Sequence, residues 1–195
     1  YAANNLNQYT SAGNATFLYD ADGNLTNKTE NGVTTTYAYD AKNRLVAVTT
    51  PTDSWAYTYD AFGNRIAVTH NGQTTRFVID PTGLGNVAAE FDDSGQLVAR
   101  YDHGFGLLAQ TDAAGQLKFY TFSAIGHTSE ITDPTGNVAN SYSYDPFGQV
   151  LGDTGPIQNP FDFVGEFGVM SEESNMKFMR WRFYDQSIGK FIQKD

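Results

Sequence analysis

The amino-acid sequence predicts an all-β protein in which antiparallel β-hairpins stack side by side into one curved sheet. A Tyr-Asp pair, or a variant of it, recurs about every 20 residues along the 195-residue chain. A fixed period of this length is the signature of a repeat architecture. Aromatic and small side chains alternate before each pair, which is the period of a strand. Turn-forming residues follow each pair, and helical periodicity is nearly absent.

The spacing of the pairs defines the repeat unit. Successive pairs are 20 residues apart in the first four copies, then 22, 21 and 22, with 40 residues before the last copy. Two copies are looser, namely Ile79 with Asp80 and Phe122 with Ser123. The full pairs, which we predict to be the structural repeat residues, are Tyr19 and Asp20, Tyr39 and Asp40, Tyr59 and Asp60, Tyr101 and Asp102, Tyr144 and Asp145, and Tyr184 and Asp185.

Each unit has the pattern of a strand, a turn and a second strand. Trp55, Tyr57 and Tyr59 alternate with small residues, which predicts a strand with one aromatic face. The aspartate that follows can accept hydrogen bonds from backbone N–H groups of the turn, and Gly or Asn then stands where φ is positive. A β-branched run forms the return strand, and Asn71-Gly72 is typical of the turn that leads to the next hairpin.

The tyrosine and the aspartate are therefore expected to have separate tasks. The aspartate shapes the turn. The aromatic rings are expected to stack on their equivalents in adjacent hairpins, which gives aromatic contacts across strands. One unit cannot bury its aromatic face alone, whereas stacked units can.

Composition excludes several classes of partner. Asp and Glu outnumber Lys and Arg by 22 to 12, and the net charge of −10 argues against nucleic acid or an anionic membrane as a partner. There is no cysteine, so no disulfide is expected. No apolar run approaches the roughly 20 residues that span a bilayer. The first residues show no secretory signal, and the chain begins in mid-pattern, as a fragment or processed piece would.

No metal site or cofactor is predicted. The segment 20–24 resembles the start of a calcium loop, but no carboxylate closes it, and a turn held by Asp20 is the expected structure. His70, His103 and His127 show no metal-binding or catalytic spacing. The segment 177–183 interleaves basic and aromatic residues, which can bind single-stranded nucleic acid or sugar. In so acidic a chain, arginines that pair with carboxylates of neighbouring strands are the favoured interpretation.

The repeat resembles the YD-repeat, or Rhs-repeat, family. The runs "YDADGNLT", "YAYDAKNRLVAVT" and "YTYDAFGNRIAVT" match its unit nearly residue for residue. The tail resembles the Rhs-associated core segment that closes the repeat region, through Arg182, Tyr184 and Asp185, then residues 189–191, then Asp195. The resemblance thus divides the chain into a repeat array, residues 1–156, and a core-like C-terminal segment, residues 157–195.

The resemblance implies a fold and a function. Family members form a hollow, cocoon-like shell, and bacterial members use it to enclose and deliver a C-terminal toxin. We therefore expect a structural shell segment, secreted or at the bacterial cell surface, whose partners are a C-terminal toxin cargo or the remaining shell repeats. The alternative is an extracellular carbohydrate-binding or cell-adhesion module, because animal teneurins use a similar shell in adhesion and exposed aromatic ladders can stack on sugars.

The resemblance also implies that the chain is not an enzyme that turns over a substrate. Arg182 and Asp195 fall on positions implicated in an aspartyl self-cleavage centre of the family. The partner aspartate and the scissile bond would lie after Asp195, so this chain is expected to be unable to cut itself. A short strip of hairpins also leaves two open sheet edges, which predicts self-association or a need for flanking repeats.

Overall fold

One large antiparallel sheet makes up most of the molecule. The computed structural model describes residues 1–82 and 85–194. Sixteen strands pair in the order in which they occur in the sequence, so the sheet is a continuous meander of hairpins, as predicted. The strands are β1 (Ala2–Ala3), β2 (Tyr9–Ala12), β3 (Ala15–Tyr19), β4 (Leu25–Glu30), β5 (Val33–Tyr39), β6 (Leu45–Thr49), β7 (Ser54–Tyr59), β8 (Arg65–His70), β9 (Gln73–Ile79), β10 (Val87–Phe91), β11 (Leu97–His103), β12 (Leu107–Asp112), β13 (Leu117–Phe122), β14 (Thr128–Thr132), β15 (Val138–Tyr144) and β16 (Val150–Thr154).

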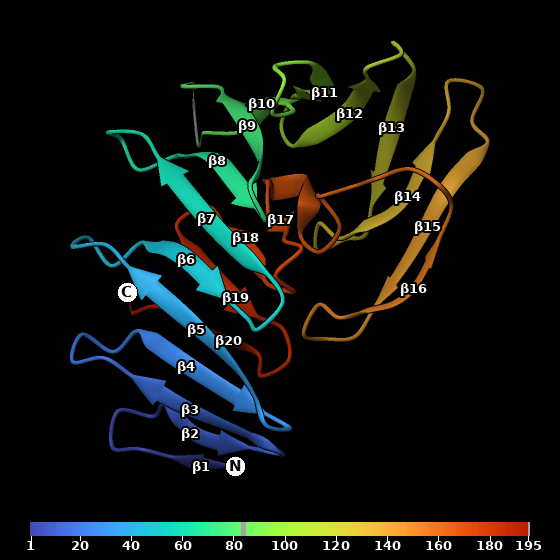
Figure 1. The fold of residues 1–195 in the computed structure, drawn as a ribbon. Coiled ribbons are helices and arrows are strands. Elements are labelled where there is room, and N and C mark those ends of the chain that lie inside the picture. The colour runs from blue at the N-terminus through green and yellow to red at the C-terminus, as the bar shows by residue number, and fades with distance from the viewer. Residues whose placement is uncertain (83–84, 195) are drawn as a thin grey trace.

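The C-terminal part of the chain forms a second, small sheet. It contains a short 3₁₀ helix, η1 (Gly165–Phe167), and four strands, β17 (Met170–Ser171), β18 (Lys177–Met179), β19 (Arg182–Asp185) and β20 (Lys190–Phe191). Figure 1 shows that the large sheet curves around these elements, so that they lie on its concave side. We propose the boundary between residues 156 and 157 for the two regions, and refer to residues 157–194 as the C-terminal segment.

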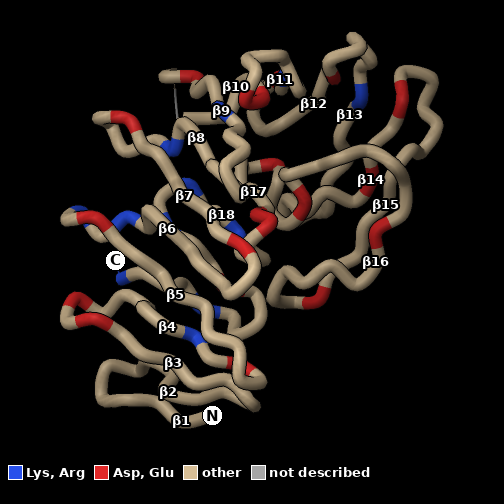
Figure 2. Tube along the Cα trace, viewed as in Figure 1, with Lys and Arg blue, Asp and Glu red and all other residues tan. Residues whose placement is uncertain are grey.

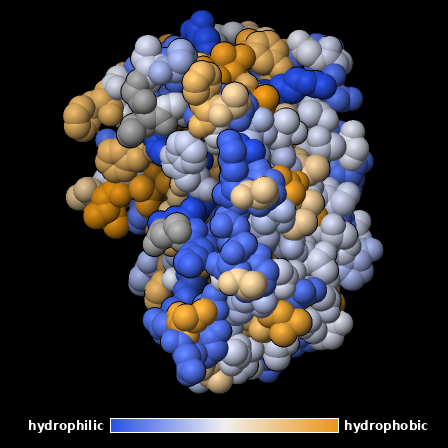
Figure 3. Space-filling model, turned by 90° about the vertical axis from the view of Figure 1, so that its left-hand side faces the viewer, coloured by the Kyte–Doolittle hydropathy of each residue, from blue (hydrophilic) through white to orange (hydrophobic). Residues whose placement is uncertain are grey.

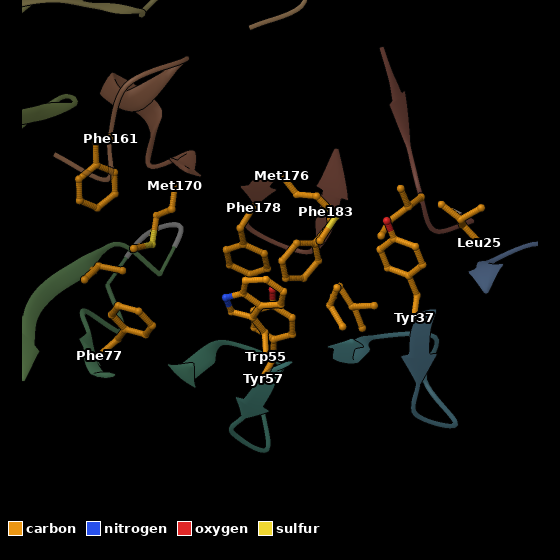
Figure 4. Close-up of a cluster of buried hydrophobic side chains, with 14 of the residues drawn as sticks. Leu25, Tyr37, Trp55, Tyr57, Phe77, Phe161, Met170, Met176, Phe178 and Phe183 are labelled. Carbon is orange, nitrogen blue, oxygen red and sulfur yellow. The ribbon is translucent and has the colours of Figure 1, made fainter. Parts of the chain in front are cut away.

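The core lies between the concave face of the large sheet and the C-terminal segment. Strand residues alternate between the two faces, as in β7, where Trp55 and Tyr57 are buried while Ala56 and Thr58 are exposed. Figure 4 shows the side chains of both layers meeting. The large sheet contributes Phe17, Leu25, Tyr37, Leu45, Val48, Trp55, Tyr57 and Phe77, and the C-terminal segment contributes Phe161, Met170, Met176, Phe178, Phe183 and Ile192.

The repeat aspartates close the turns of the hairpins. Asp40 is typical: its Oδ1 accepts hydrogen bonds from the backbone N–H groups of Lys42, at 2.9 Å, and Arg44, at 3.0 Å. Figure 2 shows acidic residues at the successive turns, for example between β3 and β4 and between β5 and β6. The same turn also forms at positions that the repeat spacing did not single out, which are Asp92, Asp112 and Asp133.

The repeat tyrosines do not stack on one another, contrary to the prediction. No close ring pair joins Tyr19 to Tyr39 or Tyr39 to Tyr59, and Arg44 lies 4.7 Å above the ring of Tyr59. Instead, four of the six hydroxyls, those of Tyr19, Tyr39, Tyr59 and Tyr144, donate a hydrogen bond to the backbone carbonyl of the first residue of an earlier strand. The ladder between β4 and β5 begins at Asn27 and Thr36, so the carbonyl of Leu25 lies outside the ladder and is left to Tyr39.

This recurring hydrogen bond joins four of the hairpins to the strand before them. The side chain at the end of one strand reaches the first carbonyl of a strand 10 to 16 residues earlier in the sequence. We refer to these contacts as the tyrosine–carbonyl bonds. They are Tyr19 to Tyr9 at 3.0 Å, Tyr39 to Leu25 at 2.8 Å, Tyr59 to Leu45 at 2.7 Å and Tyr144 to Thr128 at 2.8 Å.

Tyr101 and Asp102 are not equivalent to the other pairs, which corrects the repeat alignment. Strand β11 continues to His103, and it is His103 whose Nε2 lies 2.9 Å from the carbonyl of Val87, the first residue of β10. Tyr101 instead faces the concave side, and Asp102 is an exposed strand residue beside Arg100. The glycine-rich turn at 104–106 begins two residues later than an aspartate turn would, because Gly104, and not Asp102, donates to the carbonyl of Gly106.

The last pair belongs to the second sheet. Tyr184 lies on β19 with its ring 5.6 Å from that of Phe191, edge to face. Asp185 closes a turn by accepting from the N–H of Ser187 at 2.8 Å, and its other oxygen pairs with Lys28 of the large sheet. Asp185 therefore closes a turn, as the other repeat aspartates do, and also joins the second sheet to the large sheet.

The view of the rim that carries the turns shows mainly hydrophilic side chains with separate apolar patches (Figure 3).

In the part of the chain that the structure describes, the only helix is the three-residue η1, and no helix is long and apolar enough to cross a bilayer.

Both ends of the large sheet are open edges, because β1 and β16 each pair with one neighbour only. We expect concentration-dependent association in sedimentation velocity through these edges. Replacing Leu151 of β16, which is 70 % exposed, by lysine is expected to reduce association, since a charge on an edge strand opposes pairing. The same change at Leu18, 64 % exposed on the inner strand β3, is the control. A monodisperse monomer at all concentrations would contradict this prediction.

Candidate functional site

The C-terminal segment is held on the concave face by carboxylates that meet cations of the large sheet. Nη1 of Arg65 lies 2.6 Å from Oε1 of Glu172, and Nζ of Lys28 lies 3.0 Å from Oδ2 of Asp185. Nδ1 of His70 also contacts Glu173. Both ion pairs have the cation on the sheet and the carboxylate on the segment, so the charges fix how the segment lies on the sheet.

Arg65 is the centre of this contact. Its guanidinium carbon lies 4.1 Å above the ring of Phe178 and 5.2 Å from that of Phe77, so it stacks between the two layers. Both Arg65 and its partner Glu172 are buried. Burial raises the pKa of Glu172, and Arg65 opposes that shift. The ion pair therefore carries a large desolvation cost that only the close contact offsets.

A second group of contacts holds the start of the segment. The Thr128 hydroxyl donates to the carbonyl of Phe161 at 2.5 Å. The N–H of Val164 donates to Nδ1 of His127 at 3.0 Å, and the His127 ring stacks on Phe163 with 4.2 Å between centroids. Burial lowers the pKa of His127, which favours the neutral ring that can accept this hydrogen bond.

The aromatic side chains of the segment pack on the turn glycines of the sheet. A Cβ atom at Gly63 would lie 2.5 Å from Cζ3 of Trp181, and one at Gly126 would lie 2.6 Å from Cε2 of Phe167. The turn glycine thus has two tasks: it takes the positive φ that the turn needs, and it leaves room for the segment.

Replacing Gly63 by alanine is expected to destabilise the protein more than the same change at Gly72. Both glycines have a similar φ, 92° and 87°, so the backbone strain of alanine is shared, but nothing lies within 4 Å of a Cβ at Gly72. The additional cost at Gly63 is about 1–3 kcal/mol for overpacking against Trp181. Urea denaturation of the two variants measures the difference. It should disappear when Trp181 is also replaced by alanine, and equal effects of the two single changes would contradict the packing.

A cavity of about 780 Å³ lies between the concave face of the large sheet and the C-terminal segment. Mainly strands β7 to β13 line it on one side, and residues 156–160 and 170–173 line it on the other. Polar side chains here form hydrogen-bonded pairs with aromatic ones. The hydroxyl of Tyr101 donates to Glu90 at 3.1 Å, and that of Tyr120 lies 2.7 Å from Oε1 of Gln110 and 3.0 Å from Oδ1 of Asn159.

Glu90 is the buried acid of this cavity. Burial raises the pKa of Glu90 to about 7, while the hydrogen bond from Tyr101 and the charge of Arg65 work in the opposite direction. The nearby carboxylate of Glu172 adds to the rise. Near neutral pH, Glu90 is therefore present in both the protonated and the ionised form.

Replacing Glu90 by glutamine is expected to stabilise the protein at pH 8 and to have little effect at pH 5. Because the pKa of Glu90 is raised in the folded state, the folded protein keeps this proton where the unfolded chain, with a pKa near 4.5, has lost it. Stability is thus lost as the pH rises from about 4.5 to 7, at about 1.4 kcal/mol per unit, or roughly 3–4 kcal/mol in all. Thermal unfolding at both pH values measures it. Glu130→Gln on β14 is the matched control, and a destabilised Glu90→Gln variant at pH 8 would contradict the prediction.

One of the two residues predicted for self-cleavage lies within the described structure. Arg182 is on β19, with its guanidinium carbon 3.8 Å above the ring of Phe191, and Asp195 lies outside the described residues. Arg180 donates to Oδ1 of Asn86 at 2.9 Å. Among residues 1–82 and 85–194, no group of three or more His, Asp or Glu side chains is placed to hold a metal ion.

The fold and the filled concave face define a β-hairpin repeat protein whose curved sheet holds a polypeptide segment. The model of a family described as RHS Repeat matches residues 19–54, which contain two of the most regular units. This match and the meander of hairpins support a YD/Rhs-repeat protein.

Comparison with known proteins gives much longer relatives. The chain is 30 % identical over 129 residues to the tRNA3(Ser)-specific nuclease WapA of Bacillus spizizenii, a match that covers 64 % of this chain and 5 % of that protein. Among solved structures, TcdB2-TccC3-TEV has a TM-score of 0.48 at 13 % identity, covering 93 % of this chain and 9 % of that one. The Photorhabdus luminescens Tc holotoxin pore has a TM-score of 0.39 at 11 % identity, covering 93 % and 15 %.

Proposed function

We propose that the chain is a wall segment of a repeat shell that encloses a C-terminal toxin or effector and helps to deliver it. The observation that carries this proposal is the filled concave face: the curved sheet already surrounds 38 residues of its own chain, residues 157–194, through buried aromatic side chains and ion pairs. A wall that holds one polypeptide segment in this way is suited to hold more of the chain that follows it.

The relatives support the same proposal. One carries the name of a tRNA-specific nuclease, which favours a toxic enzyme as the cargo. Because the match covers 5 % of that protein, the rest of the shell would come from further repeats, which are the second partner. Secretion or display at the bacterial cell surface is the location that this role requires.

Cutting the chain between its two regions tests whether the wall holds a polypeptide without a covalent link. A thrombin site placed between Gly155 and Pro156 lies just after the last strand of the large sheet. After cleavage, residues 157–195 are expected to co-elute with the sheet in gel filtration and to separate from it only in denaturant. Separation under native conditions would overturn the proposal.

Delivery is tested in the longer protein that the proposal requires. Deleting the region 1–156 is expected to abolish intoxication of target cells and to leave the activity of the purified effector unchanged. Equal intoxication without the repeats would show that the wall has no part in delivery.

Sugar binding by the repeat tyrosines, the alternative function, finds no support in their placement. Tyr39 and Tyr59 are partly buried, and their hydroxyls are used in the tyrosine–carbonyl bonds. Replacing both by alanine is expected to destabilise the fold. A glycan screen in which the double variant stays folded and loses sugar binding would favour the alternative.

Self-cleavage after the core-like segment remains a proposal for Arg182 and Asp195. A longer chain that contains the residues after Asp195 should yield two bands on a denaturing gel. An Asp195→Asn variant should yield one. Splitting that continues in this variant would remove Asp195 from the assignment.

A further inference from the structure

We propose that the cavity on the concave face is a binding site for a short extended peptide with a lysine or arginine side chain, whose cation pairs with the carboxylate of Glu90. This inference needs only the present chain and goes beyond its role as a wall. The volume of about 780 Å³ lies within the range of roughly 300–1,000 Å³ that is typical of ligand sites.

The concave face differs in chemistry between the second sheet and the cavity. Around the second sheet, apolar side chains such as Phe17, Leu45 and Val48 are buried against the C-terminal segment, beside the ion pairs of Lys28 and Arg65. The cavity instead carries Glu90 and Gln110, both buried among aromatic side chains. Each has a tyrosine as its hydrogen-bond partner, so the lining of the cavity offers polar atoms to a ligand.

Glu90 is a buried acid of the cavity that forms no ion pair with another described residue. Arg65 and Glu172, which pair with each other at 2.6 Å, act on its charge, as do the phenols of Tyr101 and Tyr120, and Asp112 and Lys118 also line the cavity. His70 is likewise engaged by acidic residues. Glu90 itself is 9 % exposed and has Tyr101 as its hydrogen-bond partner. A ligand ammonium or guanidinium would supply the missing charge.

Trp55 provides a second, independent polar group. It is 8 % exposed, and its indole Nε1 has no hydrogen-bond partner among the described residues. Figure 4 shows this nitrogen on the side of the ring that faces Phe77 and Met170, both of which line the cavity. An indole N–H can only donate, and the carbonyl of a peptide backbone is a suitable acceptor.

The separation of Trp55 and Glu90 fits an extended peptide. In the register of the sheet, Trp55 of β7 lies opposite His70 of β8, and His70 lies opposite Gln73 of β9. Glu90 of β10 lies opposite Phe77 of β9, four residues along the strand from Gln73. Three strand spacings across the sheet and four residues along a strand place the backbones of Trp55 and Glu90 on the order of 15–20 Å apart. An extended chain of about five residues spans this distance.

The aromatic rings of the cavity argue against a sugar as the ligand. One face of Trp55 is covered by His70, with 4.7 Å between centroids and 9° between the planes. Tyr101 has the Phe161 ring edge-on at 4.8 Å. Sugar recognition by stacking needs free ring faces. Hydrogen bonds from the indole N–H of Trp55 and to the carboxylate of Glu90 do not need a free ring face.

Isothermal titration of the whole chain with Ac-Ala-Ala-Lys-Ala-Ala-NH2 at pH 8 tests the proposal. The lysine peptide is expected to bind at least tenfold more tightly than the same peptide with norleucine in place of lysine. Glu90→Gln should remove this preference, while Glu130→Gln, on β14 away from the cavity, should keep it. Trp55→Phe should weaken both peptides by a similar factor, because the N–H contacts the backbone.

The pH dependence adds a readout that a structural role would not give. Binding requires ionised Glu90, whose pKa in the free protein is about 7, so affinity for the lysine peptide should fall about tenfold from pH 8 to pH 6. Equal binding of the two peptides, no binding of either, or a lysine preference that survives Glu90→Gln would overturn the proposal. So would binding of maltotriose in place of the peptide. None of these results bears on whether the cut C-terminal segment stays in the wall.

Discussion

Replacing Phe183 by alanine is expected to lower the free energy of unfolding by about 3–5 kcal/mol, the range for aromatic residues in a core. Phe183 is 0 % exposed and comes from the C-terminal segment. Its ring centroid lies 4.8 Å from that of Tyr57 on the large sheet and 5.0 Å from that of Phe178. Its removal opens a cavity where the two layers meet, so the segment and the sheet should lose stability together.

Chemical denaturation followed by circular dichroism measures this loss. The matched control is Phe105→Ala at a turn, because Phe105 is 100 % exposed and its truncation should change stability by less than about 0.5 kcal/mol. A Phe183→Ala variant as stable as the Phe105→Ala variant would show that the C-terminal segment does not pack on the sheet in solution.

Replacing Arg65 by methionine is expected to cost about 3–5 kcal/mol, because it leaves Glu172 buried without its partner. Methionine keeps much of the volume beside Phe178, so the loss reports mainly on charge. The double variant Arg65→Met with Glu172→Met should recover most of the stability, since apolar pairs of similar volume often replace buried ion pairs without loss.

A double-mutant cycle separates the pair from its surroundings. The surface pair of Arg100 and Asp102, with nitrogen and oxygen 3.6 Å apart and both side chains largely exposed, is the control. Its loss should cost less than about 1 kcal/mol. If Arg65→Met behaved like Arg100→Met, the buried pair would not hold the segment.

The hairpins could be predicted from the sequence because their signals are local. Alternation such as that of Trp55, Tyr57 and Tyr59 shows which strand residues share a face, and the aspartate of each turn binds backbone groups within four residues of itself. Such patterns act within one unit and repeat with it. Turns without a preceding tyrosine, such as that of Asp112, form by the same chemistry and could have been found from the aspartate and glycine alone.

The partners across the two layers could not be predicted, because they are distant in the sequence. Arg65 and Glu172 are more than 100 residues apart, and no pattern around either residue identifies its partner. A weaker signal was present: Arg65 and Glu90 are charged residues at inward positions of apolar strands, which indicates a partner or a function. The hydrogen bonds of the tyrosine hydroxyls could not be predicted for a related reason: every residue has a backbone carbonyl, so the sequence does not show which one is the acceptor.

His103 shows how tolerant the repeat is. It occupies the place of a tyrosine and reaches the carbonyl of Val87 with a ring nitrogen in place of a hydroxyl. The acceptor in every tyrosine–carbonyl bond is main chain, which all residue types share. This hydrogen bond therefore forms whatever side chain the acceptor residue carries. Repeat units can be duplicated or lost while the bond at each junction is kept. Such a scaffold can diverge quickly in length and in what it carries while its architecture is inherited unchanged.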